Sequence, residues 1–330
     1  MTSRTPAAVA DAAARLHGRP GPVLHFADEA PLARALAAEL GVPAWSIGCH
    51  RFPDGEFRLT LPPALPAAAL LLRGLHQPNE KLAQLLLLAP ALREAGVDRL
   101  TLIAPYLAYM RQDIAFNRGE VVSQRHLGRT LAAWFDAVLT VDPHLHRVAS
   151  MAEVVPGRKG VAVSAAGAIG AWIAAREPTA LLLGPDEESA QWVRVAADSG
   201  GLGHAVCRKI RRGDHEVEIE LPPDALQGRV VVLVDDVAST GRTLAAATAA
   251  VLARGAARVD VAVTHALFVG DAEEVIRRAG AGRIWSTDTV PHASNVIAIA
   301  PLLAQGLATA ASSGPWPAVR AMVAAAPPPT

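Results

Sequence analysis

The sequence predicts an α/β protein with two similar halves, each a mainly parallel sheet flanked by helices. Two observations predict this fold class. Short apolar runs such as 230–234 are bounded by polar turn residues, as strands buried on both faces of a parallel sheet are. The order strand, helix, glycine, strand also occurs twice, at 67–104 and at 230–264, and Gly96-Val-Asp-Arg-Leu aligns with Gly255-Ala-Ala-Arg-Val. We therefore expect two related α/β units.

The composition narrows the class of partner. The chain has 330 residues, enough for two domains, and its 31 Lys and Arg balance 31 Asp and Glu, so no overall field favours nucleic acid. Cys49 and Cys207 lie far apart and form neither a metal motif nor a disulfide framework, which fits a cytoplasmic protein. The apolar run at 64–72 is too short to span a bilayer, and residues 1–20 lack the apolar centre of a signal peptide. We expect no membrane partner.

The stretch Arg229–Leu244, RVVVLVDDVASTGRTL, carries the most specific chemistry. An apolar strand runs into Asp235 and Asp236, then into a small polar loop before an alanine-rich helix. Backbone N–H groups at a helix N-terminus bind anions, hydroxyls add donors, and Gly241 allows close approach of the backbone. The two carboxylates suit sugar hydroxyls or a phosphate-bound cation. The loop therefore predicts a sugar phosphate site, and the alternative is a strand end capped by Ser and Thr.

This stretch resembles the ribose-5-phosphate loop of type I phosphoribosyltransferases and of ribose-phosphate diphosphokinases, the PRPP synthases. The pattern is Asp-Asp, three variable residues and Thr-Gly-x-Thr. The resemblance implies two phosphoribosyltransferase-like domains. It also implies that ribose 5-phosphate is bound by residues of this loop, namely Asp235, Asp236, Ser239, Thr240, Gly241, Arg242 and Thr243. Ser239 stands where synthases usually have Asp, and Arg242 where they usually have Gly, so a changed sugar phosphate is compatible with the loop.

A second motif, Arg51-Phe-Pro-Asp-Gly-Glu56, predicts a hairpin because Asp-Gly marks a tight turn and apolar residues alternate after it. A plain surface hairpin is the alternative. The motif resembles the adenine-binding hairpin of PRPP synthases, which implies that Phe52 stacks on the purine. Asp54 and Glu56 would accept hydrogen bonds from its amine or order the turn. Phosphoribosyltransferases lack this motif.

A loop after the strand at 99–104 reads Pro105-Tyr-Leu-Ala-Tyr-Met-Arg-Gln-Asp113. The planar fork of Arg suits polyphosphate oxygens, although a solvated Arg–Asp loop is the alternative. The segment resembles a PRPP synthase signature, which implies that Arg111 and Gln112 contact ATP.

Two further strand ends carry candidate metal ligands. Asp142-Pro-His144 follows the strand at 138–141, and Asp186-Glu-Glu188 follows an apolar strand that begins at 181. Acidic residues there could equally cap a helix. The family has Asp-x-His at the first position, with the His contacting nucleotide-bound Mg²⁺, and Pro-Asp at the second. The resemblance thus implies Mg²⁺ as cofactor, with His144 and Asp186 as contacts.

Four basic residues gather in Arg208–Arg212, about 25 residues before the ribose loop. Such a run is usually a solvated loop. Its Lys-x-Arg spacing resembles the mobile catalytic loop of PRPP synthases, which implies that Lys209 and Arg211 neutralise charge on the transferring polyphosphate.

The resemblance covers about residues 22–310 and implies a divergent ribose-phosphate diphosphokinase that converts ATP and ribose 5-phosphate into PRPP and AMP. The alternatives are a phosphoribosyltransferase that consumes PRPP and a non-catalytic, synthase-associated regulatory subunit. We expect an N-terminal extension (1–20), an ATP-binding domain (21–157), a ribose-5-phosphate-binding domain (158–310) and a C-terminal helix and tail (311–330). The family also implies a homo-oligomer, a dimer or larger.

Overall fold

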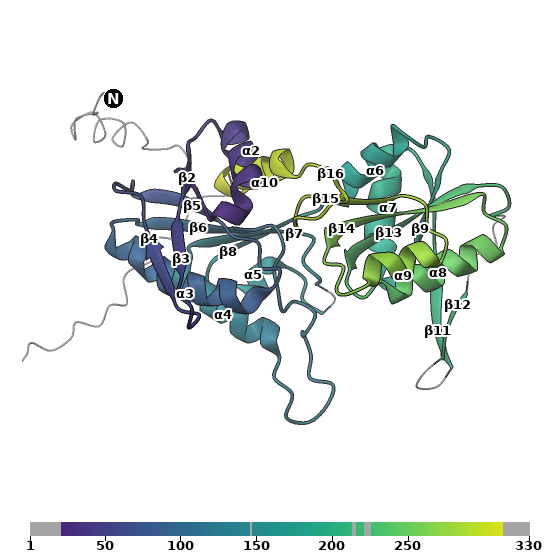
Figure 1. Ribbon diagram of the computed structural model, residues 1–330, viewed down its shortest axis with the longest axis horizontal. Helices are drawn as coiled ribbons and strands as arrows, with labels where there is room; N and C mark the ends of the chain where they lie inside the picture. The colour runs from purple at the N-terminus through teal and green to yellow at the C-terminus, as the bar shows by residue number, and fades with distance from the viewer. Residues whose placement is uncertain (1–20, 146, 213–215, 221–225, 313–330) are drawn as a thin grey trace, which may run out of the picture.

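The computed structural model describes residues 21–145, 147–212, 216–220 and 226–312, with 208–212, 216–220 and 311–312 described by their backbone only. The expected extension at 1–20 and the tail beyond 312 lie outside these residues. Two sheets lie side by side with helices on their faces, and the N-terminal half of the chain forms one lobe (Figure 1). The predicted α/β class with two phosphoribosyltransferase-like halves is confirmed.

The N-terminal sheet has six parallel strands in the order β2-β1-β5-β6-β7-β8. Its strands are β1 (Val23–His25), β2 (Ala44–Ser46), β5 (Ala68–Leu72), β6 (Arg99–Ala104), β7 (Ala137–Val141) and β8 (Lys159–Val163). The connecting helices are η1 (Ala27–Glu29), α2 (Ala30–Leu40), α3 (Pro78–Glu94), α4 (Ser123–Trp134) and α5 (Met151–Val154). α2 ends at Gly41 with a φ of 64°, the left-handed cap that glycine favours.

The C-terminal sheet repeats this arrangement in the order β10-β9-β13-β14-β15-β16, again all parallel. Its strands are β9 (Leu181–Gly184), β10 (Gly203–Val206), β13 (Val230–Ala238), β14 (Arg258–Ala266), β15 (Ile284–Thr287) and β16 (Asn295–Ile297). Its helices are η2 (Glu187–Ser189), α7 (Ala190–Gly200), α8 (Arg242–Ala253) and α9 (Ala272–Arg278). Two more helices, α6 (Ala166–Ala174) and α10 (Ala300–Ser312), join the halves.

The central strand β13 is longer than the sequence predicts. We expected a strand over 230–234 with both aspartates beyond it, but pairing with β14 continues through Asp235 opposite Val263 to Ala238 opposite Ala266. The apolar run therefore marks only the part of the strand that is buried on both faces. The carboxylates stand on the strand itself, so rigid backbone positions them.

Two antiparallel hairpins project from the sheets. The predicted hairpin around Asp54-Gly55 is confirmed as β3 (Gly48–Arg51) and β4 (Phe57–Thr60), closed by hydrogen bonds between Phe52 and Glu56 and between Gly55 and Phe52. The basic segment forms β11 (Arg208–Arg212), which pairs with β12 (Glu216–Glu220).

The halves exchange their last helices. α6 follows β8 of the first sheet yet packs against α7 of the second, whereas α10 follows β16 and packs against α2 of the first (Figure 1). Ile299, Leu303 and Leu307 accordingly belong to the same buried cluster as Leu36 and Leu70. β8 still pairs with β7 although it lies beyond the expected boundary at 157, and the domain limits stay a prediction.

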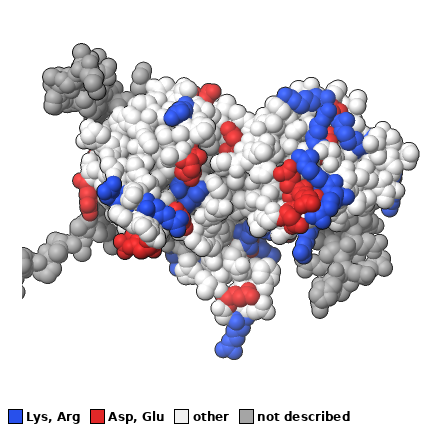
Figure 2. All heavy atoms as spheres, viewed as in Figure 1, with Lys and Arg blue, Asp and Glu red and all other residues white. Residues whose placement is uncertain are grey.

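Charged side chains are intermixed on the face shown in Figure 2, and acidic and basic residues of α9 pair there, as Glu273 does with Arg277. Within the described ranges, no helix is both long and apolar enough to cross a membrane.

The contact between α6 and α7 depends on a glycine. A Cβ added at Gly170 would lie 1.9 Å from the carbonyl oxygen of Ala196, so Gly170→Ala must push the two helices apart. Overpacking of this kind costs about 1–3 kcal/mol. We expect urea titration to show that loss in the free energy of unfolding. Gly167→Ala is the matched control, because its Cβ would meet only the Ser199 hydroxyl at 3.1 Å, and an equal loss in both variants would contradict the packing argument.

Candidate active site

The polar loop between β13 and α8 has the geometry of an anion-binding turn. Gly241 precedes α8 with a φ of 72°, and a Cβ there would lie 2.7 Å from the carbonyl oxygen of Ala272. Only glycine suits both conditions. The turn directs the first N–H groups of α8 outward, where they can bind an anion as the sequence predicts.

This loop forms one wall of a pocket of about 390 Å³ between the two halves. The second half supplies three acidic residues after β9 and the whole segment from β13 into α8, namely Asp186, Glu187, Glu188 and residues 235–244. The first half supplies Arg111 and His144. The structure thus brings the predicted ribose loop together with residues from three separate predicted motifs.

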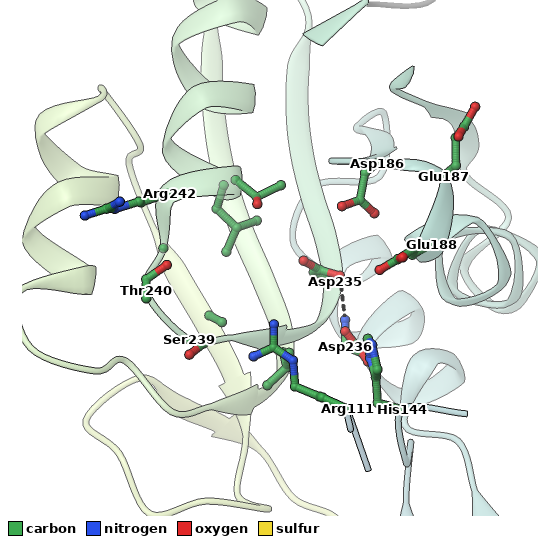
Figure 3. A pocket seen from close by; sticks show the side chains of 15 residues that line it. Arg111, His144, Asp186, Glu187, Glu188, Asp235, Asp236, Ser239, Thr240 and Arg242 are labelled. Atoms are coloured by element: carbon green, nitrogen blue, oxygen red, sulfur yellow. Dashed lines mark hydrogen bonds and ion pairs between the residues drawn. The ribbon is translucent and has the colours of Figure 1, made fainter. Parts of the chain in front are cut away.

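Three carboxylates face one another in this pocket. Asp186 and Glu188 turn toward Asp235, whereas Arg242 points away from the carboxylates (Figure 3). Burial, followed by the charges of Asp236 and Asp186, raises the pKa of Asp235 well above its ordinary value. Its Oδ1 also accepts a hydrogen bond of 3.0 Å from the backbone N–H of Asp236. The protein concentrates negative charge where a bound cation or sugar hydroxyls would relieve the repulsion.

His144 joins the two halves at the pocket. Its Nδ1 lies 2.8 Å from Oδ2 of Asp236, and the Asp236 side chain is almost completely buried. Arg111 lies beside this pair (Figure 3). A carboxylate that holds one ring nitrogen fixes the orientation of the imidazole, so the other nitrogen has a defined direction.

Two residues of the predicted ATP loop do not line this pocket. The side-chain amide of Gln112 donates to the backbone carbonyl oxygen of Ile114 at 3.2 Å. The backbone carbonyl of Gln112 accepts from the backbone N–H of Gln124. Asp113, which is buried, accepts from Arg147 at 2.7 Å. In this conformation only Arg111 of the Arg-Gln-Asp triplet reaches the pocket.

The adenine-type hairpin lies elsewhere. Phe52, Asp54 and Glu56 are absent from the pocket lining, and the hairpin stands on the outer side of the N-terminal lobe, away from β13 and α8 (Figure 1). Phe52 packs edge-on against His50, and Asp54 accepts from the N–H of Glu56 at 3.1 Å, so Asp54 orders the turn. The side chains of Lys209 and Arg211 lie outside what the structure describes.

The pocket offers oxygen donors of the kind that Mg²⁺ prefers. Among the described residues, no three His, Cys, Asp or Glu side chains are grouped to hold a metal by themselves. Mg²⁺ in phosphate-binding sites usually needs one or two carboxylates, with water and substrate phosphates as the other ligands. Asp186, Asp235 and Asp236 are hard oxygen donors around one pocket, so the residues fit that mode.

Sequence reasoning missed the residues that hold this pocket together. Asp142 is buried and accepts hydrogen bonds from Trp192, Thr264 and the N–H of Ala165. His265 is held at both ring nitrogens. Its Nε2 lies 3.1 Å from the carbonyl oxygen of Val141, and its Nδ1 lies 2.9 Å from the hydroxyl of Thr289. The strand-end position of Asp142 was the available signal, but partners this far apart in sequence cannot be read from it.

Comparisons with known proteins agree with the motifs. Residues 23–134 match the family model of the N-terminal domain of ribose phosphate pyrophosphokinase, and residues 161–279 match the phosphoribosyl transferase domain. The chain is 34% identical over 288 residues to the ribose-phosphate pyrophosphokinase of Methanopyrus kandleri, which covers 86% of this chain and 98% of that protein. Its identity to the ribose-phosphate pyrophosphokinase of Halobacterium salinarum is 33%, over 84% of this chain and 96% of that protein.

Among solved structures, the phosphoribosylpyrophosphate synthetase of Mycobacterium smegmatis matches with a TM-score of 0.76. The match covers 89% of this chain and 100% of that one at 23% identity. At that identity the likeness shows the shared two-domain fold.

The raised pKa of Asp235 gives a stability prediction. Because the folded-state pKa lies above the ordinary value, ionising Asp235 destabilises the folded protein above about pH 4. Asp235→Asn should therefore raise the free energy of unfolding at pH 7, because the amide carries no charge to bury. The gain should vanish below about pH 4, where the carboxyl is neutral in both states.

Urea titration across that pH range measures the effect. Asp198→Asn, which removes an exposed carboxylate on α7, is the matched control and should show no comparable gain. A loss of stability at pH 7 on Asp235→Asn would contradict the account of crowded charge.

Proposed function

Because the chain belongs to the ribose-phosphate pyrophosphokinase family, we propose that the pocket between its halves transfers the diphosphoryl group of ATP to O1 of ribose 5-phosphate. The products are PRPP and AMP. The observation that carries the assignment of this pocket is the convergence of the ribose loop of one half with Arg111 and His144 of the other. A reaction between two phosphorylated substrates needs binding groups on both sides of one cleft.

The C-terminal half holds the sugar. Residues 239–243 and the N-terminus of α8 bind the 5-phosphate, and the carboxylates of Asp235 and Asp236 accept hydrogen bonds from ribose hydroxyls. Rigid pairing of β13 with β14 fixes those carboxylates. Arg242 points away from them, which leaves the sugar space free of its guanidinium (Figure 3).

The N-terminal half holds the nucleotide. Arg111 offers a fork of donors to the polyphosphate, and Gln112 reaches it after a change in the loop that now ties its side chain to Ile114. Lys209 and Arg211 on β11 neutralise charge as it moves onto the leaving AMP. These four roles come from the matching motifs.

The chemical step needs positioning above all. O1 of the ribose attacks the β-phosphorus in line, and an O1–phosphorus bond forms. The bond between the β-phosphorus and the oxygen that bridges it to the α-phosphorus breaks. AMP leaves with that oxygen, and the O1 proton passes to solvent. Such transfers require little covalent participation by the protein, so the orientation of both substrates and the cationic side chains supply most of the catalysis.

The proposed cofactor is Mg²⁺, with Asp186 and His144 as its predicted contacts and Asp235 and Asp236 nearby. When bound, the ion would neutralise polyphosphate charge. The Asp236 carboxylate beside Nδ1 of His144 orients the imidazole for such a contact.

The hairpin requires a second copy of the chain. Phe52, Asp54 and Glu56 do not line the pocket of their own chain, and their hairpin stands away from β13 and α8, yet the motif predicts adenine binding (Figure 1). We therefore propose a homo-oligomer in which the hairpin of one copy completes the ATP site of its neighbour.

A cytoplasmic location of the protein remains a prediction.

Phosphorus NMR on the purified chain with ATP, Mg²⁺ and ribose 5-phosphate tests the reaction. We expect AMP and PRPP in equal amounts. Arg111→Ala should lower kcat/KM at least tenfold, because a charged hydrogen-bonding group to phosphate is worth about 1.5–3 kcal/mol. Arg118→Ala, on the same loop but outside the pocket lining, is the control. AMP without PRPP, or no effect of Arg111→Ala, would overturn the assignment.

Mixed oligomers test the hairpin. Phe52→Ala should raise the KM for ATP about 5–150-fold, since stacking contributes about 1–3 kcal/mol, and Asp235→Asn should disable the pocket. Co-expression of the two variants pairs an intact hairpin with an intact pocket in mixed oligomers. In a dimer, about a quarter of the sites should recover activity at low ATP. Activity no higher than the mean of the separate variants would mean that the hairpin acts within its own chain or not at all.

A further inference from the structure

The two halves correspond residue by residue around an internal pseudo-two-fold axis. Ala68 pairs with Arg99 in the first sheet as Val230 pairs with Arg258 in the second. Arg73 lies five residues after Ala68, and Asp235 lies five residues after Val230, so the two residues occupy equivalent positions in the two halves. Tyr106 and His265, equivalent by the same count, contact each other with ring centroids 5.0 Å apart.

The crossover to each exchanged helix is built in the same way. Leu102 pairs with Val138 as Val261 pairs with Ile284, so Asp142 is equivalent to Asp288. Asp142 accepts from the N–H of Ala165 at 2.9 Å, just before α6, and Asp288 accepts from the N–H of Ile299 at 2.8 Å, just before α10. The equivalence therefore extends from the strands to the loops that line the pockets.

The axis generates a second cleft in the place that corresponds to the active-site pocket. It has a volume of about 260 Å³ and lies between the halves. Asp28, Glu29 and His76 line it from the loops after β1 and β5, and Asp288, Thr289 and His292 line it from the loop after β15. The equivalent loops after β9, β13 and β7 line the active-site pocket.

The second cleft cannot bind a sugar phosphate in the same manner. Arg73, at the place of Asp235, donates to Asp28 at 2.8 Å and to Glu29 at 3.2 Å. Glu29 also accepts from the N–H of Gly74, and Lys81 donates to the carbonyl of Gly74. Internal ion pairs and hydrogen bonds thus fill the region that holds the ribose in the other half.

The remaining space has apolar walls and carboxylates at its edges. Pro31, Leu32, Pro105 and Pro291 form the walls. Asp28 is half exposed, and Arg73 donates to both of its oxygens at 2.8 Å. Oδ1 of Asp288 accepts from the N–H of Ile299 at 2.8 Å. A carboxylate has about four lone-pair sites, so both side chains can accept a further hydrogen bond from a donor in the cleft. The guanidinium of Arg73 is already paired with Asp28 and Glu29 and so does not offer a phosphate site. The volume is below the roughly 300–1,000 Å³ of clefts for drug-sized ligands, so the occupant is small.

We propose that this second cleft binds a small flat heterocycle that carries an amino group and no phosphate, held by Asp28 and Asp288 between the proline walls. The site is distinct from the pocket that the reaction uses. Because the occupant touches the loops after β1, β5 and β15, it links the two halves on the side of the axis opposite the active site.

Calorimetry on the full chain tests the proposal, with adenine as probe and hypoxanthine, which lacks the amino group, as the matched ligand. Saturating ribose 5-phosphate and α,β-methylene-ATP occupy the active site throughout, so turnover is not needed. We expect one adenine per chain, bound at least tenfold more tightly than hypoxanthine. Asp288→Asn retains an acceptor for the N–H of Ile299 but loses the charge, and it should weaken adenine binding at least tenfold.

Leu32→Trp fills the cleft from α2 and should abolish adenine binding. Arg34→Trp, an exposed position on the same helix outside the cleft, should leave it unchanged. Equal affinity for the two bases, no adenine binding while the ATP analogue occupies the active site, or binding that survives both Asp288→Asn and Leu32→Trp would overturn the proposal. None of these results depends on whether the active-site pocket makes PRPP.

Discussion

The structure depends on one buried carboxylate, Asp142, at the junction of its two halves. Asp142 belongs to the first half, but two of its hydrogen bonds come from Trp192 and Thr264 of the second. Burial raises the pKa of Asp142, and hydrogen bonds from Ser164, the N–H of Ala165 and Thr264 offset part of that cost by stabilising the charged form. Its φ of 34° is one that Asp tolerates better than most residues. His144 lies two residues further on, so the junction between the halves also determines where the imidazole meets Asp236.

The internal symmetry explains how one chain can offer two different clefts. Each half places the carboxyl ends of its parallel strands against the other half, and the exchanged helices α6 and α10 hold the arrangement. One cleft has a pair of aspartates and a turn with the geometry of an anion-binding site. The other has Arg73 and Gly74 at the same places, with internal partners for each. The two halves share one scaffold, and a few strand-end residues decide which chemistry each cleft supports.

The sequence predicted local structure well and long-range structure poorly. Apolar runs and turn residues located the strands, the Asp-Gly hairpin and the loop before α8, because those signals act over a few neighbouring residues. The end of β13 was misplaced because half-buried Asp235 gives no apolar signal while it still pairs with Val263. The network around Asp142 and the helix exchange were invisible from the sequence. His265 lies 124 residues from its partner Val141, and the packed helices α2 and α10 stand near opposite ends of the chain. The motifs predicted the residues of the candidate active site, but only the structure shows that Phe52 does not line the pocket of its own chain.

Ribose 5-phosphate labelled with oxygen-18 at O1 offers the most direct test of the central claim, that the sugar hydroxyl attacks the β-phosphorus of ATP in the pocket between the halves. The label should appear in PRPP in the bridge between C1 and the phosphorus that was the β-phosphorus of ATP. The ³¹P resonance of that phosphorus should then shift upfield, while the AMP resonance stays unshifted. Label in AMP, or PRPP whose bridging oxygen is unlabelled although the ribose 5-phosphate kept its label, would contradict the account.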